Sequence, residues 1–146
     1  MSDPERDPDT LPAEPPPPPG YIRHLDAVVA LVGGWVALSG LALANLGEPG
    51  TWNNVLIGTA IFLAAGYNYY RRMNDLPVSV GAATFVGLLG LWLIVSPALL
   101  DVPAVAFWST LVSGLFVAVA SGVIAHVGRE RRPVELGGEE SRADRP

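Results

Sequence analysis

The chain alternates between long apolar blocks and short polar joints. Four blocks lie at about 25–46, 52–70, 78–100 and 104–127. Each is close to the roughly 20 residues that a helix needs to cross the hydrocarbon layer of a membrane. None shows the polar face of a helix that lies on a membrane surface, and four such blocks in succession are unlike the buried helices of a soluble domain. The pattern therefore predicts four transmembrane helices.

The three joints between the blocks are short and carry turn-forming residues. They read "LGEPGT" (46–51), "RRMNDLP" (71–77) and "LDVPA" (100–104). Gly and Pro interrupt regular structure, and short connections make sequential helices antiparallel neighbours. The expected fold class is an all-α membrane bundle with up-down connections.

Charged residues lie almost entirely outside the apolar blocks, and every basic residue is Arg. The formal net charge is −5. Cytoplasmic flanks of membrane helices are enriched in basic residues, and here the basic flanks all fall on one side, at Arg23, Arg71, Arg72, Arg129, Arg131 and Arg132. Both termini are therefore expected in the cytoplasm, with the protein in the plasma membrane. The small residues "ALA" (42–44) allow signal-peptide cleavage as an alternative, but the leader before them is acidic and Pro-rich rather than basic.

The two ends of the chain have the composition of tails rather than of packed domains. Residues 1–24 are acidic and include the run "PPPPP" (15–19), which favours an extended conformation, and residues 128–146 mix acidic and basic side chains. We expect both tails to be disordered and cytoplasmic, around a membrane domain at 25–127.

The second half of the membrane domain repeats the first. At an offset of 57 positions, and then of 56 after the loop, similar residues coincide in order: Gly33 with Gly90, Trp35 with Trp92, Ser39 with Ser96, Gly40 with Pro97, Trp52 with Trp108, Gly58 with Gly114 and Gly66 with Gly122. Asn53 and Asn54 meet Ser109 and Thr110. The sequence predicts two tandem two-helix repeats, at about 25–72 and 78–127. An even number of helices in each repeat makes the copies parallel, related by a pseudo-two-fold axis along the membrane normal.

These repeated phrases resemble the SPW repeat family of small prokaryotic integral membrane proteins. The resemblance is carried by "GLWLIVSPALL" (90–100) and "TWNNVLIG" (51–58), with "GWVALSG" (34–40) and "FWSTLVSG" (107–114) as weaker copies. It covers about residues 27–127. The chain departs from the family pattern at Ala98 and Leu41, where a Trp should follow, and at Gly40, which replaces Pro. The resemblance implies a prokaryotic membrane protein built from paired helices, with no established activity to carry over.

The repeated residues have predictable structural roles. Pro97 lacks an N–H and is expected to kink or end its helix near the outer face; an opened helix that binds an ion is the alternative. Trp52 and Trp108 suit the headgroup zone at outer helix starts. Trp35 and Trp92 lie deeper, where each indole N–H needs a partner, and Ser39 and Ser96 stand one turn away on the same face. We expect a local Trp/Ser polar cluster there that holds the interface between the repeats.

Small residues recur every four positions on the fourth block. Gly114, Ala118 and Gly122 form this stripe, and Gly58 and Gly66 repeat its ends on the second block. Such stripes allow helix backbones to approach closely. The stripe is expected to serve packing within the chain, with a homo-oligomer contact or a contact to a larger membrane complex as the alternative.

No pattern in the chain indicates catalysis. The middle of each block lacks ionisable residues, which mark proton and ion pathways; Cys is absent, and His24 and His126 have no further metal ligands beside them. No nucleotide-binding motif occurs. We expect no enzyme activity, cofactor, metal or nucleic-acid partner, and a structural or accessory protein of the lipid bilayer. The alternative is a subunit of a small-molecule transporter or channel, lined by Asn53, Asn54, Ser96 and Ser109.

Overall fold

The structure, a computed structural model, describes residues 20–42 and 47–131. In these ranges it contains four helices and no strand: α1 (Tyr21–Ala42), α2 (Gly47–Met73), α3 (Val80–Leu99) and α4 (Ala104–Glu130). The predicted all-helical fold is confirmed. Helix α1 begins before the predicted start at 25, and α4 continues past the predicted end at 127. The predicted disorder of the tails concerns residues 1–19 and 132–146, which lie outside the described residues.

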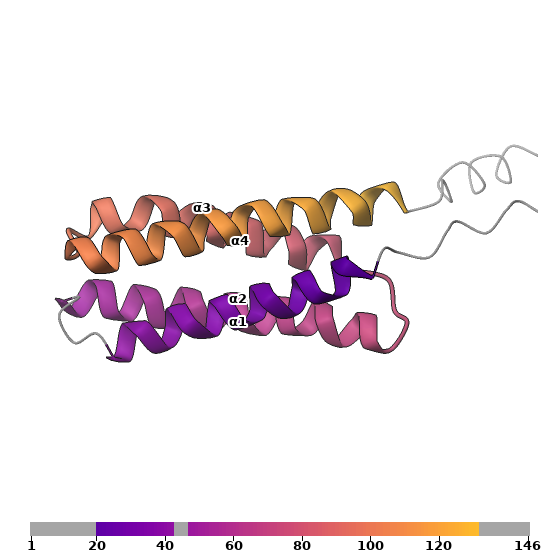
Figure 1. The fold of residues 1–146 in the computed structure, drawn as a ribbon, viewed down its shortest axis with the longest axis horizontal. Helices are drawn as coiled ribbons and strands as arrows, with labels where there is room; N and C mark the ends of the chain where they lie inside the picture. The colour runs from indigo at the N-terminus through magenta and orange to yellow at the C-terminus, as the bar shows by residue number, and fades with distance from the viewer. Residues whose placement is uncertain (1–19, 43–46, 132–146) are drawn as a thin grey trace, which may run out of the picture.

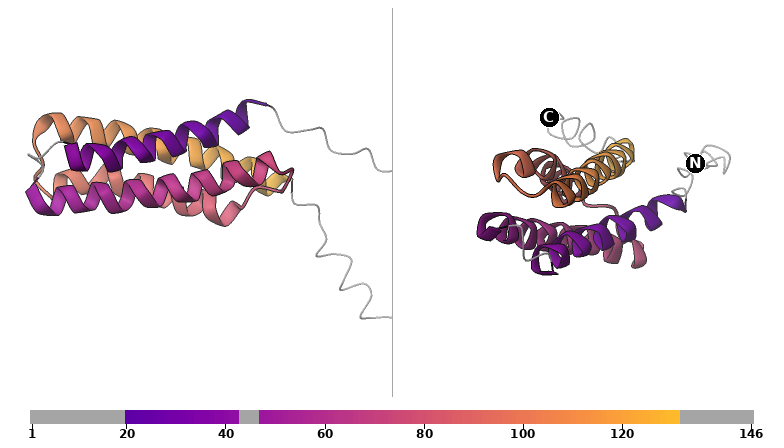
Figure 2. Two further views of the ribbon diagram at one scale, coloured as in Figure 1. Left: turned by 90° about the horizontal axis from the view of Figure 1, so that it is seen from below. Right: turned by 60° about the vertical axis from the view of Figure 1, so that its left-hand side comes forward.

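The helices form two antiparallel hairpins that lie against each other (Figure 1). One hairpin is α1 with α2 and the other is α3 with α4; across the bundle α2 contacts α3 and α1 contacts α4. Tyr21 and Glu130 lie at one end of the bundle, called here the terminal end (Figures 1 and 2). The other end, where α1 leads to α2 and α3 to α4, is called the far end.

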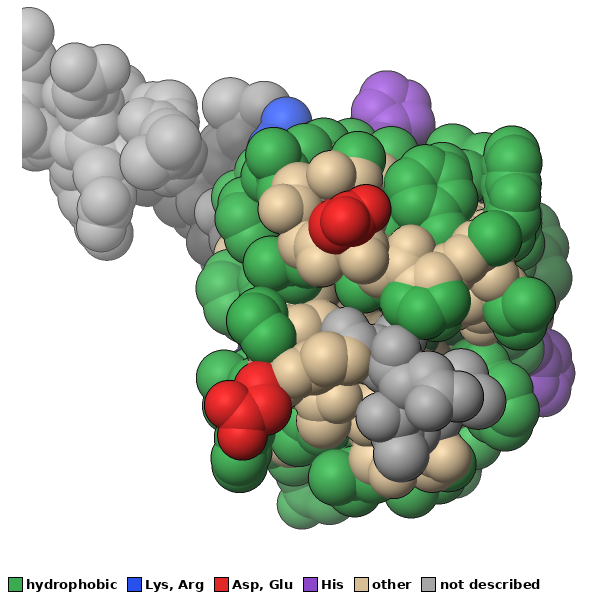
Figure 3. All heavy atoms as spheres, turned by 90° about the vertical axis from the view of Figure 1, so that its left-hand side faces the viewer, with side chains coloured by type: hydrophobic (Ala, Val, Ile, Leu, Met, Phe, Trp, Pro, Cys, Tyr) green, Lys and Arg blue, Asp and Glu red, His purple; other side chains and the backbone are tan. Residues whose placement is uncertain are grey.

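The outer surface of the bundle is apolar along its length. Helices α1, α3 and α4 are long and apolar enough to cross a membrane. Large hydrophobic side chains such as Leu31, Leu63 and Val105 point outward, and Figure 3, which looks onto the far end, shows hydrophobic side chains around the flanks. Helix α2 has 27 residues, but Asn53, Asn54 and other polar residues make it less apolar than the others. These features fit an integral membrane protein.

Glycine pairs bring the helices of each hairpin into backbone contact. A Cβ atom added to Gly33 would lie 2.7 Å from the backbone nitrogen of Phe62, and one added to Gly58 would overlap the backbone of Ala37. In the second hairpin, a Cβ atom on Gly90 would lie 2.6 Å from the backbone nitrogen of Ala118. Only glycine allows helices to approach this closely, which gains van der Waals contact where lipid provides no hydrophobic driving force.

The two hairpins make this contact at corresponding positions. A Cβ atom added to Gly114 would lie 3.0 Å from the backbone nitrogen of Ile94, just as a Cβ atom added to Gly58 would overlap the backbone of Ala37. The position of Ile94 is 57 after Ala37, and that of Gly114 is 56 after Gly58. The residues matched by the sequence repeat thus make equivalent packing contacts in both hairpins. The pseudo-two-fold axis that relates the hairpins stays a prediction.

Pro97 lies in the last turn of α3, which ends two residues later at Leu99. The Leu100 N–H donates to the Ser96 carbonyl at 2.9 Å, and the chain then turns through Asp101, which has a φ of 49°. Of the two predicted effects of Pro97, the structure therefore shows the end of the helix. Its counterpart Gly40 instead makes room for α2, because a Cβ there would lie 3.0 Å from the Thr51 carbonyl oxygen.

The glycine contacts lead to opposite expectations for two matched substitutions on α2. Gly58→Ala forces α1 and α2 apart and should lower the free energy of unfolding by about 1–3 kcal/mol. Gly66→Ala places its methyl group where nothing lies within 4 Å, and it should be neutral or stabilising by up to about 1 kcal/mol, because Ala favours helix more than Gly. The measurement is SDS titration of the purified protein in mild detergent, followed by circular dichroism. Equal effects at the two positions would contradict the packing described here.

Candidate functional site

A cluster of polar side chains joins the two hairpins near the far end. Its members come from three helices: Asn53 and Asn54 from α2, Trp92 and Ser96 from α3, and Thr110 from α4. The adjacent asparagines of "TWNN" point about 100° apart around the helix. As a result, one amide faces α3 and the other reaches α4.

Hydrogen bonds connect these five side chains in one continuous network. The Trp92 indole N–H donates to Asn53 Oδ1 at 2.8 Å, and Asn53 Nδ2 donates to Ser96 Oγ at 3.2 Å. Asn53 Nδ2 also lies 3.4 Å from Asn54 Oδ1, and Asn54 Nδ2 donates to Thr110 Oγ1 at 3.3 Å. The first hairpin supplies the amides and the second supplies the indole and both hydroxyls, so the bonds hold one hairpin to the other.

The cluster is packed rather than open. Asn54, Ser96 and Thr110 are buried, and buried polar groups are stable only when they are hydrogen-bonded. The small space among them is also lined by Gly50 and Pro97, and it is too narrow to admit a water molecule. This geometry links helices and gives no aqueous passage at this point.

The tryptophan and serine residues are not paired as the sequence predicts. Trp92 binds Asn53 instead of Ser96, and the two α3 residues meet only through that amide. In the first hairpin, Ser39 Oγ donates to the Val36 carbonyl at 2.8 Å, while Trp35 is 60 % exposed. A direct Trp–Ser bond within one helix is therefore not seen, because the indole of Trp92 faces α2 rather than its own helix. Trp92 and Ser96 instead meet through Asn53 at the interface between the repeats, where the sequence predicts the cluster.

The other repeated tryptophans lie at the outside of the bundle. Trp52 and Trp108 are exposed near the starts of α2 and α4, at the far end. Of the four side chains expected to line a transport path, the structure brings together Asn53, Asn54 and Ser96. Thr110 takes the place expected for Ser109, which is half-buried.

A second buried polar pair lies in the first hairpin near the terminal end. The Asp26 carboxylate on α1 forms a salt bridge with the Arg72 guanidinium on α2. Asp26 is 1 % exposed, and the Arg72 side chain is also largely buried. The pattern of basic flanks places Arg72 at this end of the bundle, but it does not pair Arg72 with Asp26. The available signal was a lone Asp at the start of an apolar block, at the same end of the predicted bundle as two arginines.

The connection between α2 and α3 is held by the neighbouring residues. Asn68 on α2 accepts a hydrogen bond from the Ser79 backbone N–H at 3.2 Å, and Ser79 Oγ caps α3 by accepting from the Ala82 N–H. The Arg71 Nε–H donates to the Pro77 carbonyl at 2.9 Å. These contacts use three polar residues for structure and fix how the second hairpin follows the first.

The predicted stripe of small residues on α4 splits between two environments. Gly114 and Ala118 face α3 in the close contact with Gly90, whereas a Cβ atom added to Gly122 would meet nothing within 4 Å. The first part of the stripe therefore packs within the chain, and Gly122 faces open space on the outside.

The chemistry available at these places is that of helix association. Over residues 20–42 and 47–131, no three His, Cys, Asp or Glu side chains come together in a way that would hold a metal ion. The amide, hydroxyl and indole groups of the far-end cluster bind one another, and the Asp26 carboxylate binds Arg72.

Comparison with protein families identifies a match over most of the chain. The family model described as "SPW repeat domain" matches residues 23–124, which is more than two thirds of the sequence and includes both polar clusters and the glycine contacts. Searches of curated proteins and of solved structures gave no match.

The far-end cluster predicts energetic coupling between Asn53 and Ser96. Asn53→Ala leaves the Trp92 indole N–H and the Ser96 hydroxyl without this partner, and should lower the free energy of unfolding by about 0.6–1.7 kcal/mol. In the background of Asn53→Ala, the further substitution Ser96→Ala should lower the free energy of unfolding by less than Ser96→Ala does in the wild type. A double-mutant cycle measured by SDS titration tests this difference. Ser109→Ala is the control and should change little. Additive effects at Asn53 and Ser96 would contradict the bond between them.

The Asp26–Arg72 pair predicts a loss that a second substitution repairs. Arg72→Met leaves a carboxylate buried without its partner and should destabilise the protein by about 3 kcal/mol. Asp26→Leu should cost less, because the long Arg72 side chain can extend toward the membrane surface. The double variant Asp26→Leu/Arg72→Met should regain most of the stability of the wild type, since a well-packed apolar pair often replaces a buried salt bridge without cost. A double variant as unstable as the sum of the two single variants would show that the pair is not the reason for the loss.

Proposed function

The chain belongs to the SPW repeat family, and we propose that it is a multi-pass membrane protein with a structural or accessory role and no enzyme activity. In this proposal it acts by associating, through its helices, with further copies of itself or with a larger membrane complex. The observation that carries the proposal is the far-end cluster, whose polar groups bind one another and leave no room for water.

All four helices cross the membrane in this proposal, α2 included. A helix of 27 residues is about 40 Å long, which exceeds the hydrocarbon thickness of about 30 Å. The polar residues that lower its hydropathy, Asn54 and Asn68, are buried against neighbouring helices, while Leu56 and Leu63 point outward. The lipid-facing surface of α2 is therefore more apolar than the overall composition of the helix indicates.

The charges support an orientation with both termini in the cytoplasm of a prokaryote, at its plasma membrane. Described arginines gather at the terminal end: Arg23, Arg71, Arg72, Arg129 and Arg131. The far end carries the acidic Glu48 and Asp101 instead. Basic flanks are retained on the cytoplasmic side during insertion.

The surface available for association is the apolar outside of the helices. The backbones of Gly114 and Ala118 pack against α3, so this part of the predicted stripe is used within the chain, and we place association on the outward-facing large side chains. The transporter or channel alternative would use Asn53, Asn54 and Ser96, and the hydrogen bonds among them speak for the structural role.

The deciding experiment is the mass of the complex extracted from native membranes in mild detergent after cross-linking. We expect the 15.4-kDa chain in a particle heavier than a monomer, with itself or one defined membrane protein as the second component. Only monomer, with and without cross-linking, would overturn the accessory role. Solute flux into vesicles that Asn53→Ala abolishes while the mass is unchanged would favour the transporter alternative.

A further inference from the structure

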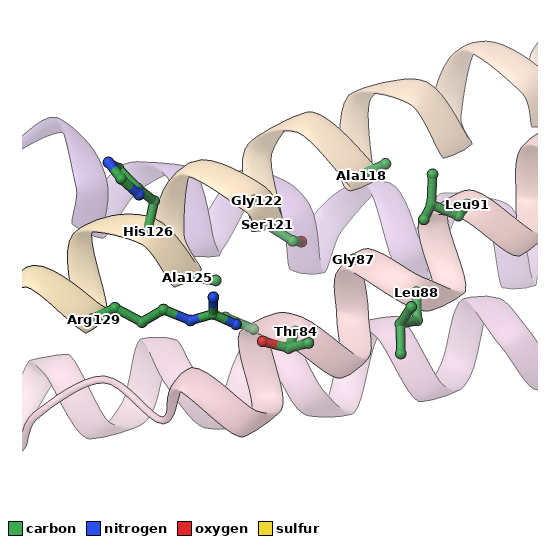
Figure 4. A pocket seen from close by; sticks show the side chains of 11 residues that line it. Thr84, Gly87, Leu88, Leu91, Ala118, Ser121, Gly122, Ala125, His126 and Arg129 are labelled. Carbon is green, nitrogen blue, oxygen red and sulfur yellow. The ribbon is translucent and has the colours of Figure 1, made fainter.

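A groove runs along the outside of the second hairpin, between α3 and α4 (Figure 4). Its volume is about 420 Å³. Many of the residues that line it are small, among them Gly87 on α3 and Ala118 and Gly122 on α4. The groove extends from Leu91 to Arg129 at the terminal end. A groove of this kind on a lipid-facing surface must be filled, because an empty apolar hollow loses contacts on one side.

The first hairpin carries larger side chains at some of the corresponding positions, although Gly66 matches Gly122. Position 118 corresponds to Phe62, position 125 to Tyr69 and position 129 to Met73. The Phe62 ring lies against α1, 3.5 Å from the place of a Cβ atom on Gly34. At these positions the lining of the groove differs from the first hairpin and does not follow from the shared hairpin contact.

A buried polar group without a partner lies in the groove wall. Ser121 is 1 % exposed, and its Oγ has no hydrogen-bond partner among the described residues. Its side chain points from α4 toward the α3 wall near Gly87 (Figure 4), and its Cβ lies 3.6 Å from where a Cβ of Gly87 would be. A hydroxyl held in an apolar surrounding needs a partner, and a molecule in the groove is placed to supply one.

A cation lies at the terminal end of the same groove. The Arg129 side chain runs along the groove toward Thr84 (Figure 4). The salt bridges in the described part of the chain are Asp26–Arg72 and His126–Glu130, so Arg129 has none there. No carboxylate of the described residues therefore forms a salt bridge with its guanidinium.

The spacing of the two polar groups matches the depth of a phospholipid head. Arg129 and Ser121 are eight positions apart on α4, or about 12 Å along the axis. Helical side chains lean toward the N-terminus of their helix, which brings the guanidinium closer to the level of Ser121. The polar layer of a membrane leaflet is about 5–8 Å thick, so a phosphate at Arg129 puts glycerol ester oxygens near Ser121.

We propose that the α3–α4 groove binds one anionic phospholipid from the leaflet at the terminal end. Its phosphate pairs with Arg129, a glycerol ester oxygen accepts a hydrogen bond from Ser121, and an acyl chain packs along Gly87, Ala118 and Gly122. The inference rests on the membrane location proposed above and adds a ligand to it. A second copy of the chain is the alternative occupant: its large outward-facing side chains are apolar, and its exposed helix carboxylates, Glu48 and Glu130, lie only at the helix ends.

The test is native mass spectrometry of the full chain in detergent with phosphatidylglycerol or, for comparison, phosphatidylcholine. We expect one phosphatidylglycerol to be retained for each chain in preference to phosphatidylcholine. Arg129→Gln should weaken that binding about fivefold, the effect of one surface cation on an anionic lipid, whereas Arg23→Gln, which removes an exposed arginine at the same end, should not.

The groove itself is tested by a pair of glycine substitutions. Gly122→Leu has room for its Cβ, with nothing within 4 Å, and its side chain would occupy the groove and should abolish retention. Gly66→Leu adds the same side chain at the matched open position of the first hairpin and should leave retention unchanged. Ser121→Ala should weaken lipid binding while leaving stability in lipid-free detergent as it was.

Three outcomes would overturn the inference. The first is equal retention of the two lipids, and the second is an equal loss in the control variants Arg23→Gln and Gly66→Leu. The third is a dimer that Gly122→Leu separates into monomers, which would make the groove an interface between copies. A monomer without protein partners that still retains phosphatidylglycerol would remove the accessory role and support the lipid site, so the two proposals fail separately.

Discussion

The bundle depends on the backbone contacts that glycine permits inside each hairpin. Between helices in lipid, burial of apolar surface adds little, and association relies on close packing and on hydrogen bonds. Gly33 with Gly58, and Gly90 with Gly114, bring the paired helices together near their middles. This close approach also fixes the position of each helix along the bundle axis relative to its neighbour. As a result, the polar residues near the far end lie at the same depth in the bundle.

Hydrogen bonds hold the two hairpins together, whereas glycine contacts hold together the two helices within each hairpin. The contacts between α2 and α3 and between α1 and α4 are fewer than those within a hairpin, and the far-end cluster lies at the junction of α2, α3 and α4. The first hairpin brings amides and the second brings hydroxyls, so matched positions carry different but complementary groups: Asn54 meets Thr110, which stands 56 positions later in the sequence. A strict copy of the first repeat would place an amide opposite an amide.

Features that depend on a single helix could be predicted from the sequence, whereas features that depend on how two helices are placed against each other could not. Apolar length and the spacing of Gly58 and Gly114 are readable along one helix, and they indicated the four helices and the close packing. The partner of Trp92 depends on how α2 and α3 are rotated against each other, which no single helix encodes, and so the sequence favoured the nearby Ser96 over Asn53. The Asp26–Arg72 pair joins positions 46 residues apart and requires the α1–α2 register to be known.

The same separation of roles explains how two matched hairpins differ on the outside. Because the hairpin contact needs only its glycines and their opposing backbone, side chains that face away from it are free to change without altering the fold. Phe62 and Met73 fill the surface of the first hairpin, whereas Ala118 and Arg129 at the matched positions leave a hollow with a cation at its end. Shared positions therefore report mainly on architecture, and the chemistry proposed for the groove comes from positions such as 118 and 129, where the hairpins differ.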